Sequence, residues 1–159
     1  MLLLMSRLGL RCGEVAALAL EDVDWRAGQL AVRGKGNRRD LLPLPVQVGQ
    51  AVADYLHLGR PVTAIGRSVF VRVKAPHRGL SSGGVTQAVA AAGRRAGLGS
   101  VRGHRLRHTA ATSMLAAGAS LAEIGQVLRH ARPLTTAIYA KVDIQALRTL
   151  ARPWPQVLS

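Results

Sequence analysis

The stretch HRLRHTAATSMLAAG, residues 104–118, carries both a helical period and a cluster of cationic side chains. Its apolar residues recur at the spacing of one helix face, and they are Leu106, Ala110, Met114 and Ala117. Gly118 follows the last of them, and glycine is the residue found most often just past a helix end. The stretch therefore predicts an amphipathic helix that buries one side in a protein core.

The cationic side chains of this helix share a face of their own. His104, Arg107 and His108 stand at positions i, i+3 and i+4, and we expect their face to lie opposite the core face that begins at Leu106. Two imidazoles and a guanidinium can all donate hydrogen bonds, which suits a bound phosphate. A solvated helix start in an arginine-rich chain is the alternative. Zinc is disfavoured, because the glutamate of the H-E-x-x-H pattern is missing and Arg107 would repel the cation.

Outward from this helix, the sequence predicts a mostly helical α+β domain with one small antiparallel sheet near the N-terminus. Residues 30–33 and 38–44 are expected to be strands joined by the turn 34–37, since Gly and Asn tolerate the positive φ of hairpin turns. Residues 21–24 are expected to be a turn, and 68–73 a short strand. Apolar spacing, prolines and a capping box at residues 120–123 predict the remaining helices, over 2–10, 14–20, 48–56, 85–97, 121–128, 133–139 and 144–150.

The chain is strongly basic, with 22 Lys and Arg against 8 Asp and Glu in 159 residues and a formal charge of +14. Its hydrophobic fraction of 48% is enough for a core, which excludes a basic disordered tail. A compact body with this charge repels itself, and a polyanionic partner is the usual reason to tolerate it. All but three of the bases are arginine, which grips phosphate bidentately, although a GC-rich genome accounts for the bias equally well. The few aromatic residues disfavour stacking on single strands, so duplex DNA is the expected partner.

The composition also disfavours several classes of protein. Cys12 is the only cysteine, so there is no disulfide framework and no cysteine zinc site, and a reducing cytoplasm is the default. The apolar run 1–5 is too short to cross a bilayer or to form a signal-peptide core, so no membrane partner is expected. Eight scattered carboxylates argue against a multi-metal nuclease. We therefore expect no metal, no other cofactor and no small-molecule substrate.

Four further positions carry chemistry related to that of the histidine–arginine cluster. Arg11 lies where glycines interrupt a helix, and local pairing with Glu14 is its ordinary role. Lys35 lies at the hairpin tip, where lysines are normally solvated. His130 follows a helix end and Tyr139 comes nine residues later; a tyrosine on an amphipathic helix is most often a core or boundary residue. Each signal is weak when it is taken alone.

These four residues, taken together with His104 and Arg107, form an ordered series along the chain. The series resembles the catalytic series of the tyrosine recombinase, or phage integrase, family. The series runs Arg11, Lys35, His104, Arg107, His130 and Tyr139. The matching motifs are Gly9-Leu10-Arg11 with Glu14, Gly34-Lys35-Gly36-Asn37 with Pro43-Leu44, His104-x-Leu106-Arg107-His108-Thr109, and Thr136-x-x-Tyr139. Several independent motifs in the right order make the resemblance specific. It implies the helical catalytic domain of these enzymes.

The resemblance implies a site-specific DNA recombinase or integrase that cleaves and rejoins strands. Tyr139 would attack the scissile phosphate, forming a 3′-phosphotyrosyl link and expelling a 5′-hydroxyl. Arg11 and Arg107 would clamp the non-bridging oxygens, where negative charge builds in the transition state. Lys35 would protonate the leaving 5′-oxygen. A covalent intermediate keeps the energy of the broken phosphodiester, so rejoining needs no ATP.

The remaining polar residues take their roles from the same resemblance. His130 would hydrogen-bond the phosphate, and His104 would act beside the tyrosine or the phosphate as an acid–base participant. Glu14 and His108 would be supporting positions. The cationic neighbours have a physical purpose, because a phenol titrates near about 10 and needs positive charge to stabilise the phenolate. The arginines also take the place of a metal as the charge clamp.

The chain departs from the family pattern in a few places. Members usually carry a separate N-terminal DNA-binding domain, whereas the match here begins within ten residues of Met1. We therefore expect a single catalytic domain, residues 1–159, that lacks the N-terminal domain and binds DNA weakly. Arg129 stands where the family commonly has a glycine, and Ala110 stands where it commonly has a phenylalanine.

Other functions stay open at the level of sequence. One is a non-catalytic DNA-binding remnant of an integrase, and another is a type IB topoisomerase-like enzyme that relaxes DNA. An RNA- or ribosome-associated basic domain is disfavoured by the ordered series of residues. The resemblance further implies a cytoplasmic, nucleoid-associated bacterial protein, with a homo-oligomer on DNA as an open alternative to a monomer.

Overall fold

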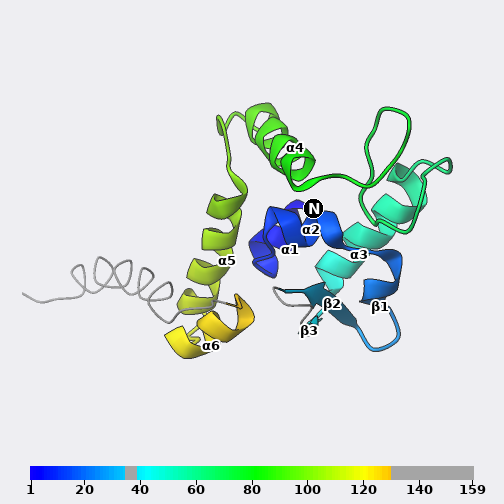
Figure 1. Ribbon diagram of the computed structural model, residues 1–159. Coiled ribbons are helices and arrows are strands. Elements are labelled where there is room, and N and C mark those ends of the chain that lie inside the picture. The colour runs from blue at the N-terminus through cyan, green and yellow to red at the C-terminus, as the bar shows by residue number, and fades with distance from the viewer. Residues whose placement is uncertain (35–38, 130–159) are drawn as a thin grey trace, which may run out of the picture. The chain divides into compact units, whose positions relative to one another are not determined.

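The computed structural model of the protein describes residues 1–34 and 39–129 (Figure 1). They form two compact units, residues 1–110 and residues from 111 onward. The first unit holds α1 (Leu2–Arg7), α2 (Cys12–Ala17), the 3-10 turn η1 (Leu20–Asp22), β1 (Val23–Asp24), β2 (Gln29–Arg33), β3 (Arg39–Pro43), α3 (Val46–Asp54), the π-helical turn η3 (Tyr55–Gly59) and α4 (Ser82–Arg95). Helix α5 (Gly103–Ala116) belongs to both units, and α6 (Leu121–Val127) to the second. Helices with one small sheet confirm the predicted fold class.

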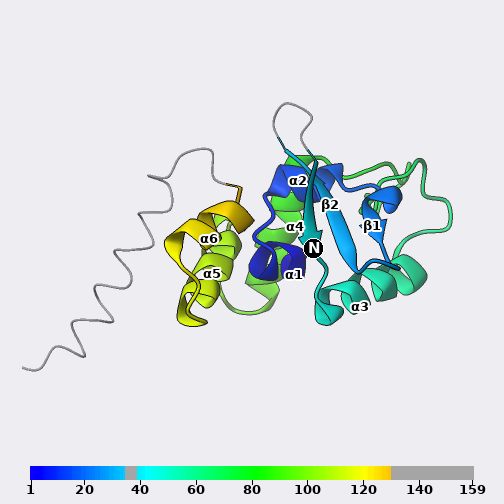
Figure 2. The same ribbon diagram turned by 90° about the horizontal axis from the view of Figure 1, so that it is seen from below.

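The sheet of the first unit has three antiparallel strands in the order β1-β2-β3 (Figure 2). Leu30 in the central strand pairs with Val23 on one side and with Leu42 on the other. Leu30 and Val32 alternate with less buried neighbours, which is the period of a strand with one face in the core. The predicted antiparallel pairing of the two strands is confirmed, whereas most of the turn expected at 34–37 lies outside the described residues. The turn expected at residues 21–24 was wrong, because η1 and β1 occupy this segment and the Val23 side chain is buried.

A buried carboxylate fixes the end of the β2–β3 hairpin. Asp22 is only 2% exposed and accepts a hydrogen bond from the backbone N–H of Ala19 at 3.0 Å. Its Oδ1 also lies 2.9 Å from Nη2 of Arg39 and 3.5 Å from Nη2 of Arg33. Arg33 and Arg39 are partners in the register of β2 and β3, so one carboxylate offsets two cations that face each other across the strands.

The core of the first unit is aliphatic. Helix α2 packs against α4 and β2, and α1 packs against α2 and α3. Val85 and Val89 are fully buried on one face of α4, at the predicted helical spacing. Gly93 continues this face: a Cβ there would lie 2.9 Å from the carbonyl oxygen of Gly99 and 2.6 Å from Cγ2 of Val101. A glycine therefore lets the end of α4 approach the chain that leads into α5.

The segment between η3 and α4 contains no strand over 68–73, contrary to the prediction. Only single antiparallel bridges form there, between Ala19 and Ser68 and between Val71 and Gly79. Val69, Phe70 and Val71 are all buried, so the segment lacks the alternation of a sheet with one solvated face. The Phe70 ring instead packs on Tyr55, with 5.1 Å between the ring centroids.

The described part of the second unit is a helical hairpin around Ala111, Ile124 and Leu128. The predicted capping box is confirmed, since Ser120 donates its backbone N–H to Glu123 at 2.8 Å and accepts that of Glu123 at 3.3 Å. Past the end of α6, Arg129 has a φ of +54°, in the left-handed region that favours glycine. The helices expected over 133–139 and 144–150 lie outside the described residues. No helix within 1–34 or 39–129 is long and apolar enough to span a membrane.

Candidate active site

Arg11 lies at the start of α2, where Glu14 fixes it in two ways. The Glu14 carboxylate accepts the backbone N–H of Arg11 at 2.7 Å and the guanidinium Nη1–H at 2.8 Å. The Arg11 side chain is 46% exposed, whereas that of Glu14 is 9% exposed. Glu14 thus caps the helix and orients a guanidinium that solvent still reaches. The local pairing of Arg11 with Glu14 that the sequence predicts is therefore present.

Arg107 is buried, which corrects the prediction about the face that it occupies. Its side chain lies on the buried side of α5 with Gly103, Ala110 and Ala111, whereas Leu106 is half-buried at the edge of that side. The guanidinium Nη1–H donates to the carbonyl oxygen of Gly9. A buried guanidinium is stable when its donors are satisfied, and apolar periodicity alone cannot reveal this. The cationic residue thus lies on the core side of the helix.

Close packing brings the start of α5 to the start of α2. A Cβ added at Gly103 would lie 2.5 Å from Sγ of Cys12 and 2.6 Å from Cε of Met5. Gly103 is one helical turn before Arg107, and Cys12 directly follows Arg11. The hydrogen bond from Arg107 to Gly9 reaches the same segment. Both arginines therefore belong to one small region around residues 9–12.

The histidines of α5 lie one turn apart on either side of Arg107. His104 is exposed and His108 is half-buried. The first turn of α5 carries no acidic residue that would offset their positive charge when they are protonated. No group of three His, Cys, Asp or Glu that could hold a metal ion occurs in the described part of the chain. Imidazole and guanidinium donors are the chemistry that this helix offers.

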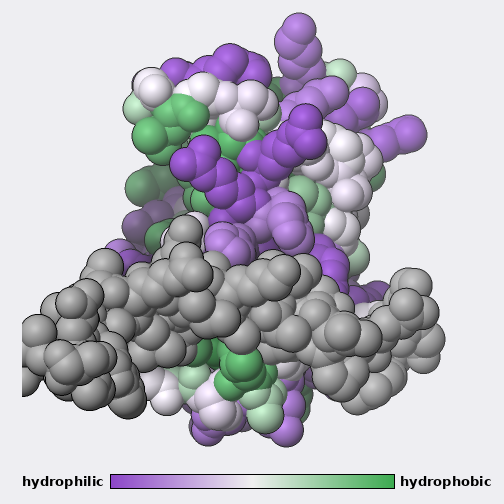
Figure 3. Space-filling model, turned by 90° about the vertical axis from the view of Figure 1, so that its left-hand side faces the viewer, coloured by the Kyte–Doolittle hydropathy of each residue, from purple (hydrophilic) through white to green (hydrophobic). Residues whose placement is uncertain are grey.

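More cationic side chains surround the start of α5. In the upper part of Figure 3, where α4 ends and α5 begins, hydrophilic side chains gather on the surface. The exposed arginines of this region are Arg94, Arg95, Arg102 and Arg105. A concentration of guanidinium groups at the end of α4 and the start of α5 suits a polyanion with several phosphates.

Three of the candidate residues, Lys35, His130 and Tyr139, lie outside the described residues. Of the other candidates, the structure joins Arg11 with Glu14 and brings Arg107 to the same segment, with His104 and His108 on the same helix. Sequence reasoning missed Gly9 as the hydrogen-bond acceptor for Arg107. The signal that could have revealed this acceptor is the glycine between two helices. It marks a turn, and the backbone carbonyl of a turn can accept a hydrogen bond from a side chain.

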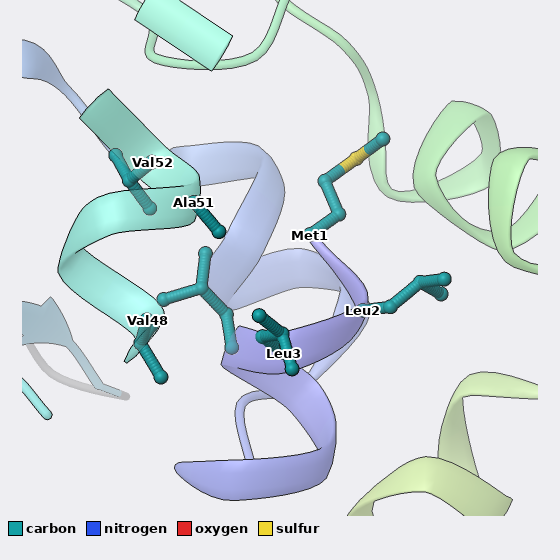
Figure 4. A pocket seen from close by; sticks show the side chains of 7 residues that line it. Met1, Leu2, Leu3, Val48, Ala51 and Val52 are labelled. Atoms are coloured by element: carbon teal, nitrogen blue, oxygen red, sulfur yellow. The ribbon is translucent and has the colours of Figure 1, made fainter. Parts of the chain in front are cut away.

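An apolar hollow of about 230 Å³ lies apart from these residues, between α1 and α3 (Figure 4). Its lining residues are Met1, Leu2, Leu3, Leu4, Val48, Ala51 and Val52. Burial there lowers the pKa of the Met1 amine to about 6. An aliphatic lining offers no side-chain hydrogen-bond donor, so this hollow does not suit a phosphate.

The chain is similar to a family of known proteins over most of its length. The model of the phage integrase family matches residues 1–146. The integrase/recombinase y4rA of Sinorhizobium fredii is 53% identical over 158 residues, which cover 98% of this chain and 38% of that protein. The crystal structure of XerA recombinase matches with a TM-score of 0.79 and 29% identity, over 95% of this chain and 55% of that one. The XerH site-specific recombinase, solved with a palindromic difH substrate after cleavage, has the same fold, with a TM-score of 0.79 at 22% identity over 98% of this chain and 45% of that one.

Proposed function

The chain belongs to the phage integrase family, and from this premise we propose that it is a tyrosine recombinase catalytic domain that cleaves and rejoins duplex DNA. The observation that carries the proposal is the pair of anchored arginines. Glu14 orients Arg11 at 2.8 Å, and the carbonyl of Gly9, two residues earlier, holds Arg107. Two guanidinium groups at one short segment can bind the two non-bridging oxygens of a single phosphate. Because the chain spans 38% of the length of y4rA, the activity of the whole protein belongs to the proposal.

The proposed reaction is a phosphoryl transfer to Tyr139. The phenol loses its proton, its oxygen bonds to phosphorus, and the bond from phosphorus to the 5′-oxygen breaks. His104 is the proposed acid–base participant near the phenol, and Lys35 the donor of a proton to the 5′-oxygen. Rejoining reverses these steps with the 5′-hydroxyl of a new strand.

Anchoring explains how the arginines would accelerate this step. A side chain already held in place loses no further rotamer freedom when charge develops on the phosphate. Loss of one such preorganised donor reduces rates by roughly 10²–10³-fold in other enzymes. We therefore expect Arg107→Ala to lower the rate of strand cleavage by about this factor. His130 is proposed to add a further hydrogen bond to the phosphate, and His108 to support the arrangement.

Duplex DNA is the proposed partner. The arginines at the end of α4 and the start of α5 would contact its backbone outside the scissile phosphate, which supplies affinity with little sequence information. Binding should then weaken with salt, with log K falling by roughly 0.9 per contacted phosphate for each decade of concentration. An affinity that does not change with salt would contradict this surface.

Covalent trapping tests the proposed function. The probe is a pool of labelled duplexes with a nick at a fixed position and random sequence beside it, so that the short 5′-hydroxyl fragment diffuses away after cleavage. The expected result is a protein–DNA adduct on a denaturing gel that is absent for Tyr139→Phe. An adduct that persists in Tyr139→Phe would refute the nucleophile, and no adduct from any duplex would favour a non-catalytic DNA-binding domain.

A further inference from the structure

The turn between α1 and α2 has the geometry of a helix end closed by glycine. The backbone N–H groups of Leu8 and Leu10 both donate to the carbonyl oxygen of Leu4, at 3.3 and 3.2 Å. Gly9 lies between them with a φ of +63°. A glycine in the left-handed conformation directly after the last helical turn is a common way to end a helix, and here the chain folds back so that Leu4 accepts from both flanking residues. Leu8 and Leu10 are buried on either side, so the direction of the Gly9 peptide is fixed.

The Gly9 carbonyl has a hydrogen-bond partner that a helix end does not require. It accepts the Nη1–H of Arg107, which is separated from it by 98 positions in the sequence and is only 4% exposed. A guanidinium has five N–H donors and no acceptor, so a buried one is oriented by the acceptors around it. The carbonyl is neutral, and it can therefore hold the guanidinium without cancelling its charge, unlike the carboxylate that holds Arg11.

We propose that Gly9 is the positioning residue of the arginine clamp: its left-handed turn points one carbonyl at Arg107 and sets Arg11, two residues later, at the start of α2. An L-residue with a side chain adopts this conformation only with strain. Replacement of Gly9 would therefore rotate the carbonyl away from Arg107 and shift both arginines together. This inference rests on the proposed function only for the identity of the bound group, a phosphodiester.

The matched pair of variants is Gly9→Ala and Gly13→Ala. Gly13 is in the first turn of α2, and a Cβ there would meet only Oγ of Ser82, at 3.9 Å. We expect Gly9→Ala to slow formation of the covalent adduct by roughly 10- to 100-fold, the effect of displacing a catalytic group by about 1 Å. Gly13→Ala should leave the rate within twofold of the unaltered chain.

A change of substrate distinguishes two explanations of a slow Gly9→Ala variant: misplaced guanidinium groups and general damage to the fold. Replacing one charged non-bridging oxygen of the scissile phosphate by a methyl group gives a neutral methylphosphonate, which needs less compensation by guanidinium groups. If Gly9 acts through the clamp, the defect of Gly9→Ala should shrink at least threefold on the methylphosphonate duplex. An equal defect on both duplexes, or no defect on either, would overturn the proposal.

A measurement without DNA keeps the inference testable apart from the activity. In the unaltered protein, side-chain NMR of arginine labelled with ¹⁵N should show Nη–H signals of Arg107 that are resolved and protected from exchange, identified by their loss in Arg107→Lys. Gly13→Ala should keep these signals and Gly9→Ala should lose them. Rapid rotation of this guanidinium in the unaltered chain would refute the role of Gly9 even if Gly9→Ala fails to fold. Protected signals without any adduct would leave Gly9 as the anchor of Arg107 and refute the recombinase proposal instead.

Discussion

Replacement of Asp22 by alanine is expected to destabilise the chain by about 2–3 kcal/mol. The Ala19 N–H loses its acceptor at 3.0 Å, which costs about 1 kcal/mol for a capping interaction at a helix start. Breaking a fully buried ion pair costs about 3–5 kcal/mol, but Arg33 and Arg39 are 46% and 57% exposed. Water therefore re-solvates much of their charge, and the loss of the pairs should contribute about 1–2 kcal/mol.

Glu21 provides the matched control, because it is the neighbouring carboxylate and also pairs with an arginine. Its bond to Arg67 is 3.1 Å long, but the Arg67 side chain is 69% exposed and that of Glu21 is 47% exposed. Asp22→Ala and Glu21→Gln each remove one negative charge, so any general effect of net charge cancels between them. Asp22→Asn keeps an acceptor for Ala19 and should fall between the two.

Urea unfolding followed by circular dichroism measures these differences. Asp22→Ala should lower the midpoint clearly, whereas Glu21→Gln should leave it within experimental error. If the two variants have the same midpoint, then burial of the carboxylate does not set its contribution and the reasoning is wrong. If Asp22→Asn lowers the midpoint as much as Asp22→Ala does, then the charge of Asp22 alone accounts for its contribution and the capping bond to Ala19 contributes nothing.

Three other perturbations test separate parts of the fold. Gly93→Ala should cost about 1–3 kcal/mol in urea unfolding because its Cβ would lie 2.9 Å from the Gly99 carbonyl oxygen, whereas Gly83→Ala, with only Ser81 Oγ at 3.8 Å, should not destabilise the chain. Arg129 has a φ of +54°, which costs about 1 kcal/mol of strain for a residue with a side chain. Arg129→Gly should relieve this strain and slow proteolysis of the second unit, and faster proteolysis would contradict the strain. The lowered pKa of the Met1 amine, about 6, means that between pH 6 and 8 the unfolded chain binds a proton that the folded chain does not. Stability should therefore rise with pH across this window by less than about 3 kcal/mol, and Nα-acetylation should remove the rise.

Local signals in the sequence predicted the regular elements well. Helix α6 follows from Ser120 and Glu123 and from the apolar residues behind them, and both hydrogen bonds of the capping box are present. The hairpin follows from glycines and alternation. Strand β1 was missed because it has two residues and depends on pairing with β2, a contact that no local pattern contains.

The candidate site was predicted as a set of residues but not as a geometry. The motif around Arg107 was recognised, whereas the burial of its side chain was not, because a hydrogen bond to the distant Gly9 carbonyl makes that burial stable. Asp22 was overlooked for a similar reason. In the sequence it belongs to an acidic turn, and only the fold brings Arg33 and Arg39 to it.

The distribution of the few carboxylates refines what the charge of +14 means. Glu14 orients Arg11, Asp22 holds the ends of β2 and β3, and Glu123 caps a helix, so these acids are committed to particular structural bonds. Among the described residues, no carboxylate pairs with the exposed arginines at the junction of α4 and α5. Their repulsion is uncompensated there, and a bound polyanion would relieve it. The concentration of exposed arginines at this junction, more than the total charge of +14, therefore supports the proposed duplex DNA partner.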